Sequence, residues 1–434
     1  MTSSLPDQVA GSSDRQFTTG MWCPSVNFFS LFILVGLVSL SFVILPLASR
    51  AGVTDPCTSS VSGSVSGASY GLVSGVWEAP SDTPSAKGEK GKRVLVLSPS
   101  PENKRNSEGS FITLRDGKLL FIYTHYGSGG NGDHDSACLK GRISGDGGKT
   151  WSEKDQLILE NEGAMNIMSV SLLRLRNGSI ALFYLRKNST EDCIPVMRLS
   201  ENEGESWGPP VECITDRKGY FVLNNDRAIQ LSGGRIILPV ALHKVPGDPA
   251  WPQKAKLFCY YSDDNGQSWA AGNQVPDTTA IITQEPGVIE MKNGQLLMFI
   301  RASGGYQQFA LSADRGVTWS HIGSLGVASP LSPASIKKIP STGDWLMVWN
   351  NNDGSRPQTK GERTPLTVAV SRDEGKTWPY ITDIETDPDG WYCYTAIHFY
   401  KRHVLLGYCA GSQQAGTHLD VAAIRRIRVS DLYR

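Results

Sequence analysis

The chain has 434 residues, of which 40% are hydrophobic and 19% charged, and its 42 basic side chains balance its 42 acidic ones. A formal net charge of zero argues against nucleic acid as a bulk partner, because nucleic-acid-binding domains carry an excess of basic residues. The length is sufficient for a large domain with a sizeable core.

The first 94 residues contain three segments of different composition. Residues 1–20 are polar and are expected to form a tail. Residues 21–49 have no charged side chain and are long enough to span a bilayer as a helix. Two interpretations of this span stay open, an uncleaved signal anchor and a secretory signal peptide cleaved near Arg50. Both predict an exported protein, membrane-anchored or secreted.

Residues 50–94 are rich in Ser, Gly and Pro and are expected to form a low-complexity linker to a domain at 95–434. Seven cysteines follow the apolar span, and export permits disulfides. Cys393 and Cys409 flank the last predicted hairpin, so we expect them on neighbouring strands. No spacing of Cys or His indicates a metal site, and no cofactor is expected.

Six segments of the predicted domain share one pattern, in which an apolar alternating run, a turn and a second apolar run follow one another. This pattern predicts a β-hairpin in each segment. The segments are 109–123, 170–184, 227–240, 287–301, 335–349 and 395–408.

Five copies of the motif Ser-x-Asp-x-Gly-x-Thr/Ser-Trp follow these hairpins, with Asn202 replacing the Asp once. The copies start at Ser144, Ser200, Ser262, Ser312 and Ser371. Ser and Asp side chains can bond to nearby backbone N–H groups and hold a turn, and the Trp suits packing between units. We interpret the motif as structural. Repeats of this length predict stacked units, and six hairpins predict an all-β, six-bladed β-propeller behind the N-terminal membrane-spanning or signal segment.

Polar residues precede the predicted first strand of most units. Alignment of the hairpins by their turns brings together Glu108, Ser169, the run 225–227, Glu285, Pro333 and Tyr394. In a propeller these strand starts lie near the central axis, which predicts a shared polar pocket. For Ser169 and Pro333 a purely structural role is expected. We favour functional roles for Glu285, Asp226, Arg227 and Tyr394.

The motif copies resemble the Asp-box, or BNR, repeats of the sialidase superfamily, and the resemblance covers about 105–430. More specific is the order Glu285, Arg301, Arg363, Tyr394, because sialidases have a Glu, two arginines and a Tyr in this order. The resemblance implies that Tyr394 is a covalent nucleophile and that Glu285 is its base. It also implies that the arginines clamp the substrate carboxylate, as the planar guanidinium group allows.

Two further roles leave alternatives open. The family has an acid/base Asp before the first box, and here the loop GSGGNGDHDSA offers Asp133, which we prefer, and Asp135. The first arginine of the family lies in Arg-Ile-Pro, which this chain lacks. Arg105 is one candidate for that arginine, and the Asp226-Arg227 pair is the other.

The resemblance therefore predicts a retaining exo-sialidase that acts on sialylated glycans. The alternatives are a propeller hydrolase or lyase for another acidic sugar, and a non-catalytic carbohydrate-binding propeller. The ordered Glu, Arg, Arg and Tyr favour the enzyme, since a binding module has no need of the full set. The sequence does not define the oligomeric state.

Overall fold

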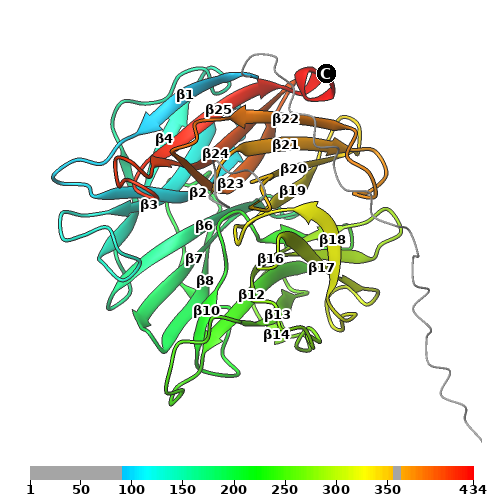
Figure 1. Cartoon of the computed structure of the whole chain (residues 1–434). Helices are drawn as coiled ribbons and strands as arrows, with labels where there is room; N and C mark the ends of the chain where they lie inside the picture. The colour runs from blue at the N-terminus through cyan, green and yellow to red at the C-terminus, as the bar shows by residue number, and fades with distance from the viewer. Residues whose placement is uncertain (1–89, 355–362) are drawn as a thin grey trace, which may run out of the picture. The chain divides into compact units, whose positions relative to one another are not determined.

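The computed structural model describes residues 90–354 and 363–434, which all belong to one compact unit of the chain. Within this part the chain forms 25 β-strands and a short 3-10 helix, η1 (Val429–Tyr433) (Figure 1). None of its helices has the length and apolar character needed to cross a bilayer. The predicted tail, the predicted span at 21–49 and most of the predicted linker lie outside the described residues.

Four of the sheets have four strands each, and neighbouring strands within them are antiparallel. The strands of the first sheet are β2 (Arg105–Thr113), β3 (Leu119–Tyr126), β4 (Ala137–Ser144) and β5 (Gln156–Leu159). Those of the second are β15 (Thr283–Glu290), β16 (Leu296–Ala302), β17 (Tyr306–Ser312) and β18 (Gly323–Ala328). Those of the third are β19 (Ser335–Lys338), β20 (Trp345–Trp349), β21 (Leu366–Ser371) and β22 (Tyr380–Glu385).

The fourth sheet joins the two ends of the described chain. Its order is β1-β25-β24-β23, so the first described strand pairs with the last. The strands are β1 (Lys92–Leu97), β23 (Gly390–Tyr400), β24 (His403–Ser412) and β25 (Ala422–Arg428). β1 begins three residues before the domain boundary that we expected at 95, because its pairing partner lies more than 300 residues away and gives no local sequence signal.

The remaining sheet has nine strands, in which β10 links two four-stranded groups through one parallel contact with β8 and an antiparallel pairing with β12. The first group is β6 (Asn166–Arg174), β7 (Ile180–Ser189), β8 (Asp192–Ser200) and β9 (Val211–Glu212). The other strands are β10 (Tyr220–Val222), β11 (Ile229–Gln230), β12 (Ile236–Lys244), β13 (Lys256–Ser262) and β14 (Ala270–Ala271).

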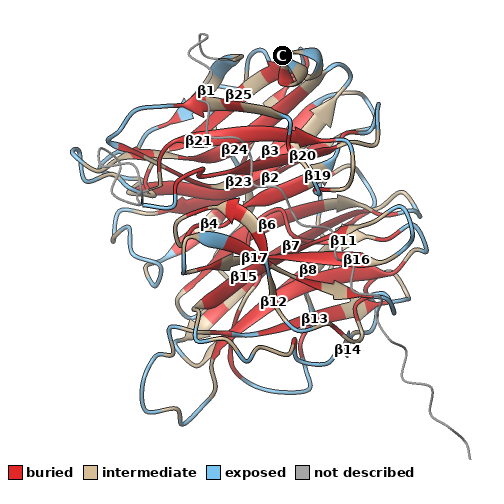
Figure 2. Ribbon diagram, turned by 45° about the vertical axis from the view of Figure 1, so that its right-hand side comes forward, coloured by how far each residue is buried: buried red, intermediate tan, exposed pale blue. Residues whose placement is uncertain are grey.

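The sheets form a closed circuit through their early strands. β2 contacts β6, β12 contacts β15, β15 contacts β19, β19 contacts β23, and β23 returns to β2, while β6 and β12 share a sheet. Buried residues fill the strands and exposed residues lie mainly in the loops (Figure 2). This is a propeller-like arrangement, in which radial packing of similar units leaves few exposed sheet edges.

All six predicted hairpins are present, as β2-β3, β6-β7, β11-β12, β15-β16, β19-β20 and β23-β24. In the last of them Lys401 holds the turn with a φ of 52°, where other hairpin turns use glycine. Cys393 and Cys409 face each other across β23 and β24, as expected for neighbouring strands, and both are free thiols.

Each of the five motif copies forms the turn that follows the third strand of its four-stranded unit. In the copy at 262–269, the Ser262 hydroxyl donates to Asp264 at 2.7 Å and accepts from the Gly266 N–H at 2.7 Å. The Asp264 carboxylate also accepts from the N–H and the hydroxyl of Ser268, at 2.9 and 2.6 Å. Three of the other copies repeat these bonds, and in the copy at 200–207 the Asn202 side-chain nitrogen donates to the Ser206 hydroxyl instead. These hydrogen bonds stay within each turn, as a structural role requires.

Candidate active site

A shared backbone conformation marks the starts of the early strands. Glu108, Ser169, Glu285 and Tyr394 have φ angles of 54°, 61°, 43° and 55°, and each lies where the pairing of its strand with the next one shifts register. Such left-handed conformations cost about 1–3 kcal/mol each in residues other than glycine. A β-bulge re-aims a side chain, and here the side chains meet in pairs, Ser169 with Glu108 and Tyr394 with Glu285.

Tyr394 and Glu285 are in contact although they come from different sheets, on β23 and β15. The Tyr394 hydroxyl donates to Glu285 Oε1 at 3.2 Å. Arg301 Nη1 lies 2.6 Å from the same carboxylate oxygen and 3.4 Å from the Tyr394 hydroxyl. Arg301 reaches this point because β16 pairs it with Gln284, the neighbour of Glu285. Asn224 Nδ2 donates to Glu285 Oε2 at 3.2 Å and completes its coordination.

The protonation states of this cluster suit a phenol with a carboxylate base. Burial raises the pKa of Tyr394, and the nearby Glu285 carboxylate raises it further, so the phenol is neutral at rest. Burial also acts to raise the pKa of Glu285, but the Arg301 guanidinium outweighs it and holds the pKa below its ordinary value. Glu285 is therefore ionised and available to accept the Tyr394 proton.

Arg363 borders the other side of Tyr394. The centre of its guanidinium lies 5.3 Å from the Tyr394 ring centroid and 5.1 Å from that of Trp391. Arg363 Nη1 donates to the Cys393 thiol sulfur at 2.9 Å. The guanidinium of Arg363 therefore lies against two aromatic rings and a thiol.

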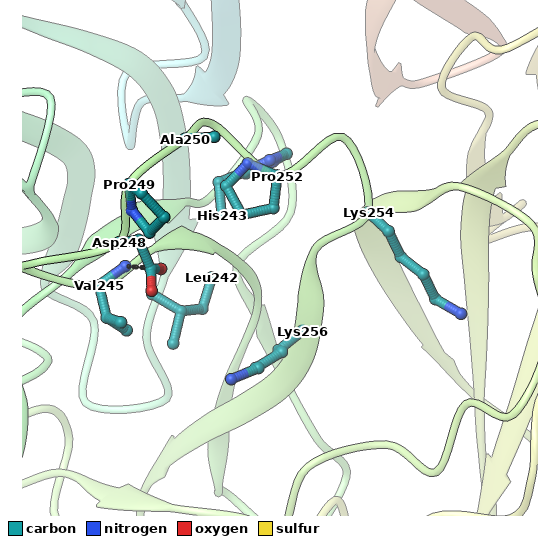
Figure 3. Close-up of a pocket in the computed structure, with 9 residues that line it drawn as sticks. All are labelled: Leu242, His243, Val245, Asp248, Pro249, Ala250, Pro252, Lys254 and Lys256. Carbon is teal, nitrogen blue, oxygen red and sulfur yellow. Dashed lines mark hydrogen bonds between the residues drawn. The ribbon is translucent and has the colours of Figure 1, made fainter.

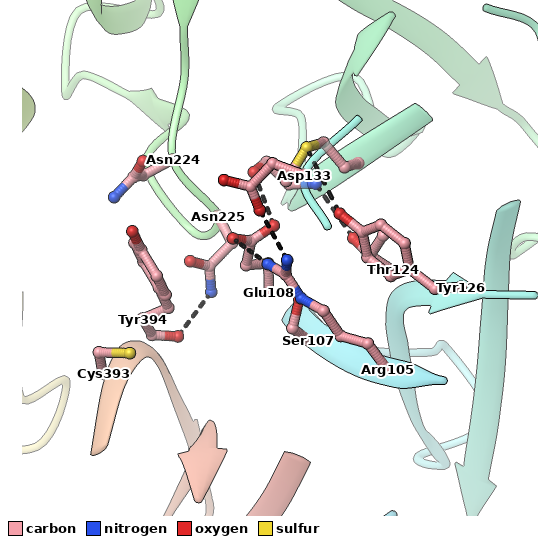
Figure 4. A network of polar contacts seen from close by, with 12 residues as sticks. Arg105, Ser107, Glu108, Thr124, Tyr126, Asp133, Asn224, Asn225, Cys393 and Tyr394 are labelled. Carbon is pink, nitrogen blue, oxygen red and sulfur yellow. Dashed lines mark hydrogen bonds and ion pairs between the residues drawn. The ribbon is translucent and has the colours of Figure 1, made fainter. Parts of the chain in front are cut away.

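A second cluster faces Tyr394 across Asn225, which donates to the backbone oxygens of Gly109 at 2.8 Å and Tyr394 at 2.9 Å (Figure 4). Its centre is the buried Arg105, which is 2% exposed. Arg105 Nη1 lies 2.6 Å from Asp133 Oδ1, and Nη2 lies 3.3 Å from Glu108 Oε1. These contacts tie two carboxyl groups to one guanidinium.

The rest of the Arg105 guanidinium is also engaged. Nε donates to the Ser107 hydroxyl at 3.1 Å, Nη1 donates to the Asn131 carbonyl at 3.2 Å, and the group covers the Tyr126 ring at 4.7 Å. Arg105 thus belongs to the cluster with Asp133 and Glu108, whereas Arg301 and Arg363 lie beside Tyr394. As a substrate-binding residue Arg105 remains a prediction.

Asp133, and not Asp135, faces this cluster. The Asp135 carboxylate accepts from the Gly132 N–H at 2.8 Å and stays within its own loop. Asn166 Nδ2 donates to the backbone carbonyls of Asp133 and Asp135, at 2.9 and 2.8 Å, and the Lys187 ammonium donates to that of Asp133. Partial burial acts to raise the pKa of Asp133, but the Arg105 charge outweighs it and lowers the pKa.

Asp226 and Arg227 point into the wall of the circuit. Asp226 accepts from Lys337 at 2.7 Å and from the Ile397 N–H at 2.8 Å. Arg227 donates to the Ser335 hydroxyl at 3.0 Å and to the Ala334 carbonyl at 2.6 Å. Because both side chains tie strands together, our functional proposal does not use them, and their role in substrate binding stays a prediction.

Four residues that contact the Tyr394 and Arg105 clusters received no role in the sequence analysis. Asn225 lies in the run 225–227, whose charged members attracted the functional assignment, and Asn224 directly precedes that run. Glu108 appeared among the aligned strand starts without a role, and Lys187 lies in an ordinary strand with no local signal. Asn225 and Glu108 share the strand-start position, which was the available signal.

A pocket of about 360 Å³ lies on the loop between β12 and β13, lined by Leu242, His243, Val245, Asp248, Pro249, Ala250, Pro252, Lys254 and Lys256 (Figure 3). Asp248 shapes this loop by accepting from the Val245 N–H at 3.0 Å. The loop borders the site, because Gln284 Nε2 donates to the Gln253 carbonyl at 2.7 Å. None of the residues of the Tyr394 cluster lines the pocket.

Comparisons with known proteins agree with the fold and the motif copies. The sequence profile of the BNR repeat-like domain matches residues 161–404, more than half of the chain. A sialidase of Bacteroides fragilis is 28% identical over 194 residues, which cover 42% of this chain and 33% of that protein. A sialidase of Paraclostridium sordellii is 27% identical over 235 residues, or 48% of this chain and 56% of that protein. The chain therefore spans about half, or less, of the length of these relatives.

A solved structure supports the architecture. The leech intramolecular trans-sialidase superposes with a TM-score of 0.62 at 15% identity, over 80% of this chain and 71% of that one. At this identity the likeness shows the fold alone.

Proposed function

This chain belongs to the BNR repeat-like domain family of the sialidase superfamily, and we propose that it is a retaining exo-sialidase that removes terminal sialic acids from glycoconjugates. The observation that carries the proposal is the Tyr394–Glu285–Arg301 cluster, with its 3.2 and 2.6 Å contacts. A buried phenol held against an ionised carboxylate and a guanidinium is an activated nucleophile.

A tyrosine nucleophile suits the charge of the substrate. A sialic acid carries a carboxylate on its anomeric carbon, which would repel a carboxylate nucleophile. Tyr394 attacks that carbon as a neutral phenol while Glu285 accepts its proton, and a glycosyl-enzyme forms. Glycosidases of this kind depart from the two-carboxylate scheme for the same reason.

Arg301 and Arg363 bind the substrate carboxylate. Both flank Tyr394, so the carboxylate that they hold presents its anomeric carbon to the phenol oxygen. Guanidinium groups pair with carboxylates through two parallel hydrogen bonds, which fix orientation as well as charge. Asp133, on the opposite side of the site, protonates the leaving oxygen and later activates water, so that two displacements retain the anomeric configuration.

We further propose that the domain has six blades, in which β10 joins two blades into the nine-stranded sheet. Five of the six then carry one motif copy between their third and fourth strands. We also propose that residues 21–49 export the domain as a signal anchor or a signal peptide, because this apolar stretch contains no charge.

One observation favours a second substrate class. Arg105 is held by Asp133, Glu108, Ser107 and Asn131, so two arginines remain beside Tyr394. A smaller clamp accommodates another acidic sugar with an anomeric carboxylate. The non-catalytic binding module stays the alternative outside the enzyme class.

The test is hydrolysis of a sialoside with a fluorescent aryl leaving group by the wild type and by Tyr394→Phe. We expect turnover by the wild type and a loss of several powers of ten in the variant, each factor of ten corresponding to about 1.4 kcal/mol of barrier. Binding of the sialoside without turnover by the wild type would favour the binding module. Turnover of another acidic glycoside alone would favour the second substrate class.

A further inference from the structure

Two carboxyl groups share the Arg105 guanidinium in very different surroundings. The Glu108 side chain is 6% exposed, whereas that of Asp133 is 58% exposed. Glu108 Oε1 lies 3.3 Å from Arg105 Nη2, and Oε2 accepts from the Ser169 hydroxyl at 3.2 Å. Asp133 Oδ1 has the shorter contact with Arg105, at 2.6 Å. The better Arg105 contact therefore goes to the more exposed carboxyl.

Charged and titratable groups surround Glu108 on several strands. Arg105 on β2 and Lys187 on β7 favour its ionised form, and Asp133 opposes it. The phenols of Tyr126 and Tyr220 and the Cys409 thiol also face this carboxyl. Burial outweighs the two cations and raises the pKa of Glu108 to about 7, while Arg105 lowers that of Asp133. Neighbouring carboxyls whose pKa values are driven apart in this way commonly divide acid and base roles.

We propose that Glu108 and Asp133 hold one exchangeable proton between them around Arg105, and that Glu108 is the positioning residue that keeps this proton available to Asp133 at neutral pH. This inference rests on the proposed function, since it concerns the proton that the leaving group receives. Because Asp133 is bound to a guanidinium, it is ionised at neutral pH when alone. A second carboxyl beside it makes the pair retain one proton, since two adjacent negative charges repel each other.

The proton balance of the reaction is then complete. In the first half, the pair gives its proton to the leaving oxygen through Asp133. Tyr394 oxygen bonds to the anomeric carbon, the glycosidic bond breaks, and Glu285 takes the phenol proton. In the second half, water returns a proton to the pair through Asp133 as its oxygen attacks, the bond to Tyr394 breaks, and Glu285 returns the phenol proton. Lys187 and Arg105 stabilise the pair while both carboxyls are ionised.

The experiment compares pH profiles of kcat/KM for two sialosides, one with an alkyl leaving group that needs an acid and one with an activated aryl group that does not. For the wild type and the alkyl sialoside we expect the alkaline limb near pH 7. Glu108→Gln removes the negative charge beside Asp133, so the limb moves at least one pH unit lower. At pH 7 the alkyl sialoside then loses at least about fivefold, and the aryl sialoside far less.

Two further variants separate this role from a structural one. Glu108→Asp keeps the carboxyl and restores most of the alkyl activity. Ser169→Ala removes the hydrogen bond that lowers the pKa of Glu108, so the alkaline limb moves to higher pH, opposite to the shift in Glu108→Gln.

An unchanged alkaline limb in Glu108→Gln, or equal losses for both sialosides, would overturn the inference. If that variant does not fold, the direction of the Ser169→Ala shift decides. Inactivity of the wild type towards every sialoside would instead reject the proposed function. The pair is then judged by carbon-13 NMR titration of the resting protein, where a Glu108 carboxyl that titrates in the ordinary range of glutamate rejects it.

Discussion

Five residues within or just before the early strands adopt one strained conformation. Glu108, Ser169, Asp226, Glu285 and Tyr394 all have positive φ angles. A non-glycine residue keeps such a conformation when surrounding contacts enforce it. Register shifts mark four of these positions, and hydrogen bonds hold Asp226. In three of the five positions the side chain belongs to the proposed reaction, and in Asp226 it ties strands together.

Substitution of Arg301 tests whether this residue binds the substrate carboxylate through two parallel hydrogen bonds. Arg301→Lys keeps the charge but cannot make two parallel hydrogen bonds to a carboxylate. We expect kcat/KM to fall nearly as far as in Arg301→Ala, by about 100-fold or more. Steady-state kinetics of both variants measure this. Near-wild-type kcat/KM in the lysine variant would show that charge alone suffices.

Each of the five motif turns connects two strands of its sheet and is held by its own hydrogen bonds. In the turn at 262–269, between β13 and β14, the Asp264 carboxylate accepts from Ser262 and Ser268. Its hydrogen bonds outweigh its slight burial and lower its pKa to about 2, so it accepts these bonds as a carboxylate. The hydrogen bonds of this turn do not involve any residue of the Tyr394 cluster.

Asp264→Ala should therefore affect stability and not catalysis. Loss of the accepted hydrogen bonds in this partly exposed turn should cost about 1–2 kcal/mol in the free energy of unfolding. Denaturant titration measures the stability, and kcat/KM per folded protein should stay within about twofold of the wild type. A large fall in kcat/KM of fully folded protein would give the motif a catalytic role that the structure does not suggest.

The elements that the sequence predicted are those with local signals. Hairpins have alternating apolar runs around a turn, and the motif copies repeat, so all six hairpins and all five turns could be located. β1 and β10 have no such signal, because pairing outside the hairpins defines them. The two-residue strands β9 and β14 are too short to show an alternating pattern.

The residues of the candidate site likewise fall into those that the sequence predicted and those that it did not. Glu285, Arg301, Arg363 and Tyr394 were predicted as one group by their order, and the structure brings them together. The engagement of Arg105 by Asp133 and Glu108 depends on how the loop after β3 folds back, which no local sequence pattern determines. The same holds for Asp226 and Arg227, whose partners come from β2, β19 and β23.

At the scale of the whole molecule, β1 brings the first described strand into the sheet that contains the last one, β25. Without β1 the strand β25 would be an unpaired edge, and Leu97 would lose its packing against the core. Unpaired edges are sites of aggregation. β2 and β23, which carry Glu108 and Tyr394, contact each other directly.

Two truncations test how much β1 contributes to the stability of the domain. A chain that starts at Lys90 should fold and keep the stability of the domain, because it retains β1. A chain that starts at Ser98 lacks β1 and should aggregate or melt at least about 5 °C lower. Thermal unfolding and size-exclusion chromatography compare the two. Equal stability would mean that β1 is dispensable.

That Tyr394 is the covalent nucleophile is tested by mass spectrometry of the protein after trapping with a fluorinated sialic acid analogue, which slows the second half of the reaction. We expect one added sugar on the peptide that contains Tyr394, and no added sugar in Tyr394→Phe. A label on any other residue, or equal labelling of the phenylalanine variant, would contradict it.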